Sequence, residues 1–439
     1  MRKPRVPINV FRERRDQLKQ MIPGSALILR AHPEQIRNHD VHHSYRQDTN
    51  LFYLTGFDEP GTVLLYRPGL TPESVLFVRV KDQERETWDG FRYGPEGALK
   101  NFGVDAAYPI EEFEKLTSEW LVAVDKIYYN LFTDEMFDRK IAKTLLGTAA
   151  LRRRSGRGIL PIYDSYPLIG ELRVIKSPYE IATLKKAAQV SAEAHVEVMK
   201  ATRPGVNERH LHGIFLKEIM ARGAAREGYG SIVAGGSNST TLHYVFNDQD
   251  LKGGDLLLVD AGAEVDYYTG DITRTFPVSG RFNPIQAKVY QMLLDLQKSI
   301  IQSVKIGVVF SKLQELTIHG LIELMREINL LKGSSEALRM DQKWRKYYPH
   351  GVSHFLGSDV HDAGRSEVDG ESRRLEVGMV LTIEPGIYIP QDDLSAPEEL
   401  RGLGLRIEDD ILVTESGPEN LSQGAPKEIV DLEKIVGKP

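Results

Sequence analysis

The sequence predicts an α+β protein with two domains, a smaller α/β domain followed by a larger one. Its 439 residues exceed what a single ordinary hydrophobic core contains. In the first part, short apolar runs alternate with helical stretches, which favours an α/β domain around a mostly buried sheet. In the second part, runs of helices and runs of strands stay apart, which is typical of α+β. We place the boundary near Gly170 and predict domains at residues 1–170 and 171–439.

The first domain is expected to begin with a helix over FRERRDQLKQMI. Four apolar runs then favour strands: SALILRA, LFYLTGF, GTVLLYRPG and ESVLFVRV. Residues 100 to 150 carry no motif from which a role follows. The basic run Arg152–Arg154 near the end of the domain has two interpretations, a contribution to a neighbouring subunit's site or a solvated linker, and the sequence leaves both open.

The second domain has clear helix start signals. Ser177 and Glu180 form a capping box with Pro178 at the first helical position, and the helix is expected to run to about Thr202. Asn283 and the proline after it open another long helix, and KIGVVFSKLQELTIHGLIELMREIN predicts a further one. Two successive helix–helix–strand blocks therefore suggest two halves of related shape.

Composition excludes several classes of protein. A net charge of −6 and a pI near 6.1 argue against a partner among nucleic acids or membrane surfaces. The absence of cysteine removes disulfides, thiolate metal sites and cysteine nucleophiles. The basic N-terminus lacks the apolar segment of a signal peptide, and no run reaches the roughly 18 apolar residues that span a bilayer. The expected location is cytoplasmic.

Acidic residues stand where buried strands are predicted. Asp260 follows the apolar run 256–259 at once, and Asp271 lies in the strand-like stretch 267–278. If the two stretches pair as a hairpin centred on Val265 and Asp266, then Asp260 lies directly across from Asp271. Like charges in that relation are destabilising, and burial adds to the cost.

More acids and several histidines follow the same pattern. Glu384 ends the apolar strand of VGMVLTIEPG, and Glu408 stands at the centre of GLGLRIEDDILVT, with Arg406 on its face. The stretch YYPHGVSHFLGSDVHDAG carries His350, His354 and His361. Taken singly, a strand acid is more often paired with a buried arginine, and a histidine more often belongs to a core or loop.

The conjunction favours a metal site. Four carboxylates in apolar strands each need several kcal/mol of compensation, and few Arg and Lys lie nearby in the sequence. A pair of divalent cations supplies that compensation. One histidine among oxygen ligands suits Mn²⁺, Fe²⁺ or Co²⁺ better than a dedicated zinc site, and the His-Glu-x-x-His signature of zinc peptidases is absent. The residues therefore predict a two-metal hydrolase.

These residues also resemble a known family. DAGAE, GDITRTFPVSG, HGVSHFLGSDVHD, TIEPGIYI and GLGLRIEDDILVT are similar to the motifs of the pita-bread metallopeptidases, which include methionine aminopeptidase, Xaa-Pro dipeptidase (prolidase) and aminopeptidase P. HSYRQDTNLFYLTGFDEPG resembles the N-terminal domain of aminopeptidase P in particular. The resemblance covers nearly the whole chain. It implies a C-terminal pita-bread (creatinase/aminopeptidase-like) catalytic domain.

The resemblance implies a role for each site residue. The metal ligands would be Asp260, Asp271, His354, Glu384 and Glu408, holding two divalent ions, Mn²⁺ first and Co²⁺, Fe²⁺ or Zn²⁺ as alternatives. The catalytic residues would be Glu384, which moves a proton, His361, which donates to the tetrahedral intermediate, and His243. The substrate would contact His350, Arg406 and Tyr388; Arg406 could instead hold Glu408, and Tyr388 could serve packing alone.

The implied activity is hydrolysis of the Xaa-Pro bond at the N-terminus of peptides, by a homo-oligomer. Prolidase is the nearest alternative. Some relatives are non-catalytic binding modules that have lost ligands, and creatinase works without the ligand set; the five ligand positions here argue against both. Methionine aminopeptidase lacks a comparable N-terminal domain. The metal used in the cell and the peptide substrates stay open.

Overall fold

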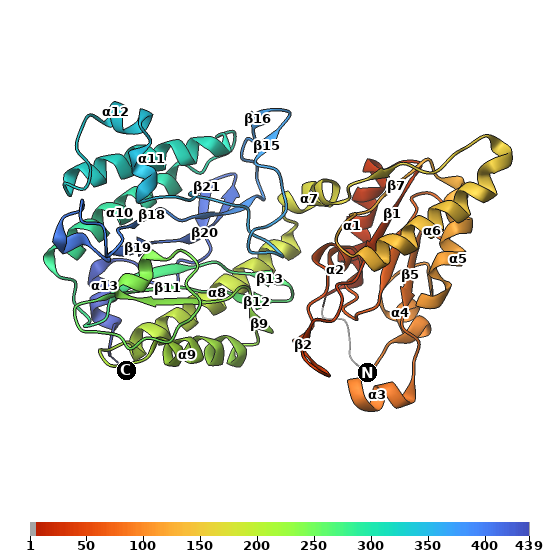
Figure 1. Ribbon diagram of the computed structural model, residues 1–439, viewed down its shortest axis with the longest axis horizontal. Coiled ribbons are helices and arrows are strands. Elements are labelled where there is room, and N and C mark those ends of the chain that lie inside the picture. Colours follow the sequence, from red (N-terminus) through yellow and green to blue (C-terminus); the bar gives the residue numbers. More distant parts are fainter. Residues whose placement is uncertain (1–5, 439) are drawn as a thin grey trace. The chain divides into compact units, whose positions relative to one another are not determined.

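The computed structural model describes residues 6–438. The chain divides into two compact units, Met1–Leu172 and Arg173–Pro439 (Figure 1). The basic N-terminal stretch is predicted not to be a signal peptide. Its first residues, 1–5, lie outside the described residues. Each unit is built around its own sheets and its own apolar clusters.

The N-terminal unit is built on a mixed six-stranded sheet in the order β6-β5-β4-β1-β7-β8. Its strands are β1 (Ser25–Arg30), β4 (Val63–Tyr66), β5 (Ser74–Val78), β6 (Ala106–Pro109), β7 (Lys126–Tyr128) and β8 (Ile162–Tyr163), with a separate hairpin of β2 (Ile36–Asn38) and β3 (Val41–His42). Its helices are α1 (Ile8–Met21), α2 (Thr49–Thr55), α3 (Gln83–Asp89), α4 (Gly94–Asn101), α5 (Phe113–Trp120), α6 (Glu135–Arg152) and most of α7 (Tyr166–Val174).

Both faces of this sheet are buried. Leu27 and Leu29 of β1 belong to one apolar cluster, whereas Ala26 and Ile28 belong to another. Because successive strand side chains point to opposite faces, the two clusters cover the two sides of the sheet. The α/β character predicted for this domain is therefore confirmed.

One predicted strand of this unit is wrong. LFYLTGF forms the end of helix α2, because Asp48 caps its start by accepting a hydrogen bond from the amide of Leu51, and Gly56 ends it in the left-handed conformation. Leu51 and Leu54 are fully buried. A short apolar run does not distinguish a buried strand from a buried helix, and here the two capping residues decide.

The C-terminal unit keeps its long helices apart from its strands. Its helices are α8 (Pro178–Ala201), α9 (Glu208–Ala221), α10 (Pro284–Ser303), α11 (Phe310–Glu327), α12 (Ser335–Met340) and α13 (Ile429–Ile435) (Figure 1). The predicted capping box of Ser177 and Glu180 is present at the start of α8, and Asn283 caps α10 with Gln286 in the same way. The α+β class is confirmed.

The strands of this unit form several small antiparallel sheets. The three-stranded ones are β10-β11-β14, β13-β12-β9 and β17-β20-β21, and the two-stranded ones are β18-β19 and β15-β16. The bounds are β9 (Arg226–Glu227), β10 (Ile232–Gly235), β11 (Leu256–Asp260), β12 (Ala263–Val265), β13 (Tyr268–Thr269), β14 (Thr273–Pro277), β15 (Glu367–Val368), β16 (Glu371–Ser372), β17 (Val380–Ile383), β18 (Gly386–Tyr388), β19 (Gly404–Arg406), β20 (Asp409–Thr414) and β21 (Gly417–Asn420).

The predicted register of the acidic hairpin is wrong, because the turn lies one position further along the chain and moves the partner of Asp260 by two residues. Asp266 and Tyr267 form the turn, both with positive φ, and Asp260 pairs with Thr273 instead of Asp271. Asp271 lies in the irregular segment between β13 and β14. Glu408 likewise lies in the break between β19 and β20, and not at the centre of one strand as predicted. Irregular backbone at these two points turns both carboxylates toward a common pocket.

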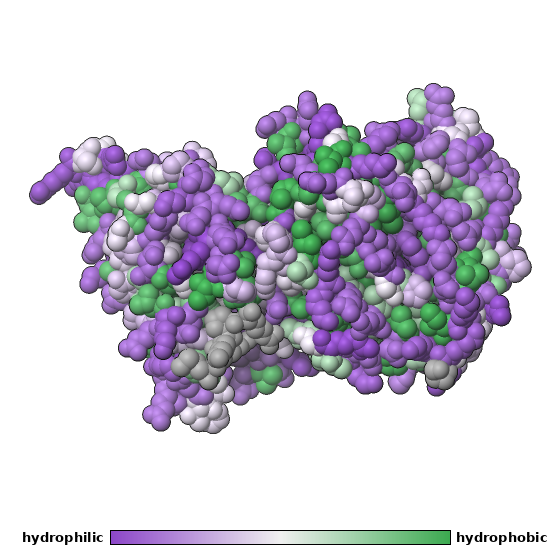
Figure 2. Space-filling model, turned by 180° about the vertical axis from the view of Figure 1, so that it is seen from behind, coloured by the Kyte–Doolittle hydropathy of each residue, from purple (hydrophilic) through white to green (hydrophobic). Residues whose placement is uncertain are grey.

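The surface is mainly hydrophilic on the face shown in Figure 2, where hydrophobic residues gather only in small patches. Among residues 6–438, no helix has the length and apolarity that crossing a bilayer requires.

Candidate active site

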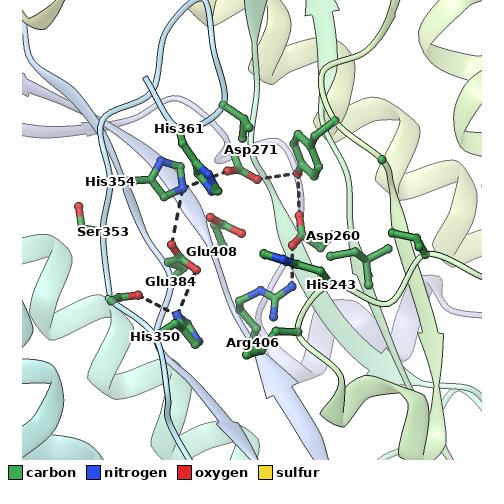
Figure 3. Close-up of a pocket in the computed structure, with 17 residues that line it drawn as sticks. His243, Asp260, Asp271, His350, Ser353, His354, His361, Glu384, Arg406 and Glu408 are labelled. Carbon is green, nitrogen blue, oxygen red and sulfur yellow. Dashed lines mark hydrogen bonds and ion pairs between the residues drawn. The ribbon is translucent and has the colours of Figure 1, made fainter. Parts of the chain in front are cut away.

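A pocket of about 660 Å³ in the C-terminal unit gathers the predicted site residues (Figure 3). Every one of them lines it except Tyr388, which contacts two of its lining residues. Part of the lining comes from residues 229–271 and part from residues 350–408, so both halves of the unit contribute. The remaining lining residues are Tyr229, Gly230, Ile232, Leu242, Val245, Gly351, Ser353 and Val360.

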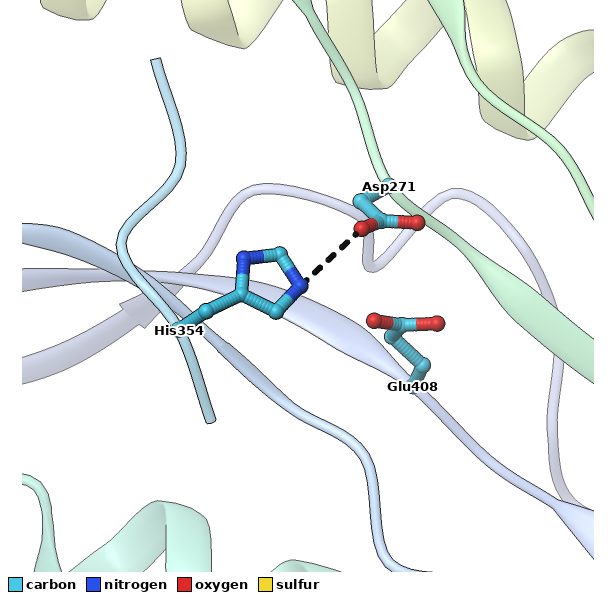
Figure 4. Close-up of side chains that lie close together, drawn as sticks. All are labelled: Asp271, His354 and Glu408. Carbon is cyan, nitrogen blue, oxygen red and sulfur yellow. Dashed lines mark ion pairs between the residues drawn. The ribbon is translucent and has the colours of Figure 1, made fainter. Parts of the chain in front are cut away.

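Asp271, His354 and Glu408 form a group that could hold a metal ion (Figure 4). One ligand atom from each lies within 4.8 Å of the others. His354 Nε2 is 3.4 Å from an oxygen of Asp271 and 3.6 Å from an oxygen of Glu384, while its Nδ1 bonds the carbonyl of Phe355 at 3.0 Å. Burial lowers the pKa of His354, but the hydrogen bond to Asp271 and the charge of Glu384 outweigh burial and raise that pKa to about 9. When the ring is neutral, the Nδ1 bond to a carbonyl keeps the proton on Nδ1, which leaves Nε2 facing the carboxylates as a metal ligand.

Tyr229 and Arg406 offset the repulsion between Asp260 and Asp271. The Tyr229 hydroxyl lies 2.6 Å from an oxygen of Asp260 and 2.6 Å from an oxygen of Asp271, so it bridges them. Arg406 Nη2 is 2.5 Å from the other oxygen of Asp260. The expectation that few cations are near was therefore too strong for Asp260, which has a buried arginine of its own.

Among the described residues, no arginine or lysine forms an ion pair with the other three carboxylates of the pocket. Burial raises the pKa of Glu384 to about 7. Burial, and after it the charge of Asp271, raises the pKa of Glu408 well above its ordinary value, and burial also raises the pKa of Asp271. Buried carboxylates that resist ionisation, arranged around an imidazole, match the donor set that hard and borderline divalent cations prefer, so the residues fit a metal site.

Arg406 also reaches the other side of the pocket. Its Nη1 donates to the Tyr388 hydroxyl at 2.9 Å, and that hydroxyl lies 2.9 Å from Nε2 of His350. Burial, followed by the charge of Arg406, lowers the pKa of His350 to about 4, so the ring is neutral near pH 7. His350 Nδ1 must then donate to the carbonyl of Gly351 at 2.7 Å, and Nε2 accepts from Tyr388.

The direct pair of Arg406 with Glu408 that the sequence left open is replaced by an indirect one. Arg406 Nε donates to the Thr273 hydroxyl at 3.0 Å, and that hydroxyl donates to Glu408 at 2.6 Å. Thr273 and Tyr229 were both missed by sequence reasoning. Thr273 lies in the motif GDITRTFPVSG, but a threonine by itself indicates no chemistry there, and Tyr229 lies in none of the motifs. Only the fold brings the two hydroxyls to the acids.

His361 and His243 stand at the pocket with few contacts of their own. The His361 ring packs edge-on against the ring of His354, with centroids 4.5 Å apart. Burial, and then the neighbouring His354, lowers the pKa of His361. His243 is exposed on a loop whose next residue, Tyr244, donates to the buried carboxylate of Glu208 at 2.9 Å.

The arginine run lies in the N-terminal unit. Arg152 is buried and ends helix α6, and Arg153 begins a short 3-10 turn. Arg152 is therefore part of a helix and not of a solvated linker.

Comparison with known proteins decides the family. Residues 182–415 match metallopeptidase family M24, and residues 11–128 match the aminopeptidase P N-terminal domain. The chain belongs to metallopeptidase family M24. It is 38% identical over 434 residues to the Xaa-Pro aminopeptidase of Haemophilus influenzae, covering 98% of each chain.

Solved structures of M24 peptidases match the whole chain as well. An aminopeptidase of Pseudomonas aeruginosa is 40% identical with a TM-score of 0.94, and 98% of each chain is covered. The Escherichia coli aminopeptidase P with the inhibitor Pro-Leu is 37% identical with a TM-score of 0.92, again with 98% of each chain covered. The resemblance inferred from motifs, and the pita-bread fold it implied, are thereby confirmed, and the chain is a metal-dependent peptidase.

Proposed function

We propose that this protein is a metal-dependent Xaa-Pro aminopeptidase, which releases the first residue of peptides that carry proline second. The observation that carries the proposal is the cluster of Asp271, His354 and Glu408 in a pocket of a chain similar over its full length to Xaa-Pro aminopeptidases. The alternative of prolidase is not favoured, because the full-length relatives named above are Xaa-Pro aminopeptidases or aminopeptidase P.

The proposed ligands of two divalent cations, Mn²⁺ first, are Asp260, Asp271, His354, Glu384 and Glu408. When bound, such cations lower the pKa of water so that a nucleophile is available near neutral pH. Asp260 is already held by Tyr229 and Arg406, which fixes its carboxylate at the pocket. The three remaining carboxylates line the same pocket and resist ionisation in the metal-free protein, which supports the assignment.

Glu384 and His361 are proposed to move and place protons. Glu384 lies in the pocket beside His354 and among the other carboxylates, where it is placed to accept a proton and release it to the leaving nitrogen. His361, exposed at the pocket wall, would donate to the oxygen on which charge develops. His243 stands at the same wall and is proposed to assist there.

His350, Arg406 and Tyr388 are proposed to hold the substrate. Proline lacks an amide hydrogen and has a fixed ring, so a pocket that accepts it must match its shape. The hydrogen bonds from Arg406 to Tyr388 and from Tyr388 to His350 hold these side chains rigidly, as a shape-selective wall requires. The Pro-Leu inhibitor of the Escherichia coli relative begins with proline, which agrees with a proline subsite here.

The test is metal-dependent hydrolysis of a small peptide panel. We expect Xaa-Pro-Yaa tripeptides and longer peptides to be cleaved with kcat/KM well above that of Xaa-Pro dipeptides, and N-acetylation to block cleavage. A chelator should abolish turnover, and Mn²⁺ should restore it. Efficient cleavage of dipeptides with negligible cleavage of tripeptides would establish prolidase activity instead. The cytoplasmic location and the homo-oligomer stay predictions.

A further inference from the structure

His361 lies in a loop without regular structure, and few contacts other than the loop backbone fix the position of its ring. Residues 356–366 form no helix or strand. Within residues 6–438 the His361 ring makes no hydrogen bond, and its ring contact is the edge-on packing against His354. An imidazole that must meet a reacting oxygen within a few tenths of an ångström therefore depends on how firmly its backbone is held.

The residue after His361 holds that backbone. The side chain of Asp362 is 1% exposed, although His361 beside it is exposed. Asp362 pairs through one oxygen with Arg173 and through the other with Lys176 Nζ at 3.1 Å. Its amide donates to the carbonyl of Phe355 at 2.9 Å, and the amide of Asp359 donates to its carboxylate at 3.3 Å. Asp362 thus ties the loop to Arg173, Lys176 and the amide of Asp359 through its carboxylate, and to Phe355 through its own amide.

Arg173 and Lys176 belong to one short segment, residues 173–176, which packs closely against the loop. A side chain at Gly364 would collide with Val174, because its Cβ would lie 2.6 Å from a methyl group of that valine. A side chain at Gly357 would collide with the Asp362 carboxylate at 2.3 Å. The two glycines let the loop lie against the segment, where the Asp362 carboxylate reaches Arg173 and Lys176.

The cations beside Asp362 keep its carboxylate ionised. Burial alone would raise the pKa of Asp362, but Arg173 and Lys176 outweigh it and lower that pKa. Arg173 also binds Asp359, at 2.6 Å. Loss of one partner of Asp362 would therefore leave an uncompensated charge beside the loop.

We propose that Asp362 is a positioning residue for His361, and that Arg173 and Lys176 form with it a buried brace for the loop. The inference rests on the proposed function, in which His361 donates to the reacting oxygen. The brace touches none of the proposed metal ligands through its ion pairs. Its loss should therefore reach catalysis through His361 and not through the metals.

The decisive experiment compares Asp362→Asn in the wild-type protein with the same substitution in a His361→Ala background, with Mn²⁺ present. In the wild-type background we expect kcat to fall about 10- to 100-fold, as a misplaced donor implies, with KM within about threefold and metal content unchanged. In the His361→Ala background the same substitution should change kcat less than about twofold, because the residue it positions is gone. An equal loss in both backgrounds, or a loss of metal, overturns the proposal.

A charge-matched variant and a control separate positioning from stability. Asp362→Asn with Lys176→Met removes one charge of each sign and should recover at least part of kcat, whereas a purely steric defect would persist. Glu180→Gln changes another buried carboxylate, in the capping box of α8, and serves as the control. It should lower stability without changing kcat. If Asp362→Asn alone fails to fold, Lys176→Met by itself provides the same comparison.

A readout without turnover keeps the inference distinct from the proposed function. With ¹³C-labelled histidine, the ring C2–H signal of His361, assigned through His361→Ala, should be single in the wild type. In Asp362→Asn it should broaden or move toward the signals of mobile histidines, while the Glu180→Gln spectrum stays unchanged. An unaltered signal in Asp362→Asn contradicts the brace. Absence of Xaa-Pro cleavage by the wild type contradicts the proposed function alone.

Discussion

Two neighbouring acids, Glu408 and Asp409, show two different ways in which this fold buries a carboxylate. Asp409 is fully buried and pairs with Arg274 at 2.7 Å and with Lys427, and it accepts hydrogen bonds from Ser422 and Gln297. Burial opposes its ionisation, but Arg274 and Lys427 outweigh burial and lower its pKa far below the ordinary value. Glu408 faces the pocket, where burial and Asp271 raise its pKa.

The difference separates structural acids from acids that await an external cation. Asp409 and Asp362 serve the fold and have their counter-charges on the same chain. In the pocket only Asp260 has an arginine, and Asp271, Glu384 and Glu408 share one imidazole. Divalent cations are the partners that such a set lacks. The following predictions test this contrast.

The largest effect is expected on the pocket side. Asp260→Ala, Asp271→Ala or Glu408→Ala should each reduce activity at least about 10³-fold by removing a ligand, because the cations supply the nucleophile. The fold should largely survive in Asp271→Ala and Glu408→Ala, since these substitutions also remove repulsion, whereas Asp260→Ala should lower stability as well because it leaves Arg406 without its buried partner. Metal analysis by mass spectrometry, together with circular dichroism, checks this. Full activity of Asp271→Ala with two metals still bound would contradict a dinuclear site.

For the structural acid Asp409, the effect is expected on the stability of the fold. Arg274→Met leaves Asp409 buried with Lys427 alone and should cost about 3–5 kcal/mol of unfolding free energy, as breaking a buried ion pair does. Denaturant unfolding measures it. Arg274→Met combined with Asp409→Leu is the matched control and should regain much of the loss. A stable Arg274→Met single variant would show that the cluster contributes little to the fold.

His361→Ala should separate chemistry from metal binding. We expect kcat to fall roughly 10²- to 10³-fold, the usual loss for one donor to a developing oxyanion, with both metals and the fold retained. Steady-state kinetics and metal analysis on the same preparation decide it. Loss of metal would mean that His361, and not His354, is the ligand.

The smallest expected effect is a change in the stability of the metal-free protein with pH. In the metal-free protein the pKa of Glu384 is raised to about 7, above its ordinary 4.5. A raised folded-state pKa gives stability that is fully present below about pH 4.5 and is lost as pH rises through about 7. Metal-free protein should therefore lose about 1–3 kcal/mol across this window. Asp409, with a lowered pKa, contributes no slope there.

Thermal unfolding with and without Mn²⁺ at pH 5.0, 6.0, 7.0 and 8.0 measures the effect. Bound cations replace the proton at the carboxylates, so the loss should disappear in the metal-loaded protein. Glu384→Gln should reduce the loss in the metal-free protein, since glutamine does not titrate, while Asp271 and Glu408, whose pKa values are also raised, still contribute. A metal-free protein that gains stability between about pH 5 and 7 would contradict the shift.

The sequence by itself determined which residues could carry chemistry and where helices begin. The capping boxes at Ser177 and Asn283 are local, because a cap and the amide it bonds lie within three residues, so they were readable without the fold. The set of acids and histidines was readable for a related reason. Their residue types stand out against apolar neighbours, and their order resembles that of a known family.

Only the tertiary structure decided how these residues meet. The error in the hairpin register arose because the turn lies at Asp266 and Tyr267, one position further than predicted, and such a shift moves every facing partner by two residues. Only the tertiary structure places the Tyr229 hydroxyl between the two aspartates, and only it pairs Arg406 with Asp260 instead of Glu408. These contacts join residues far apart in the chain, and their energies depend on burial and on distances that no local pattern encodes.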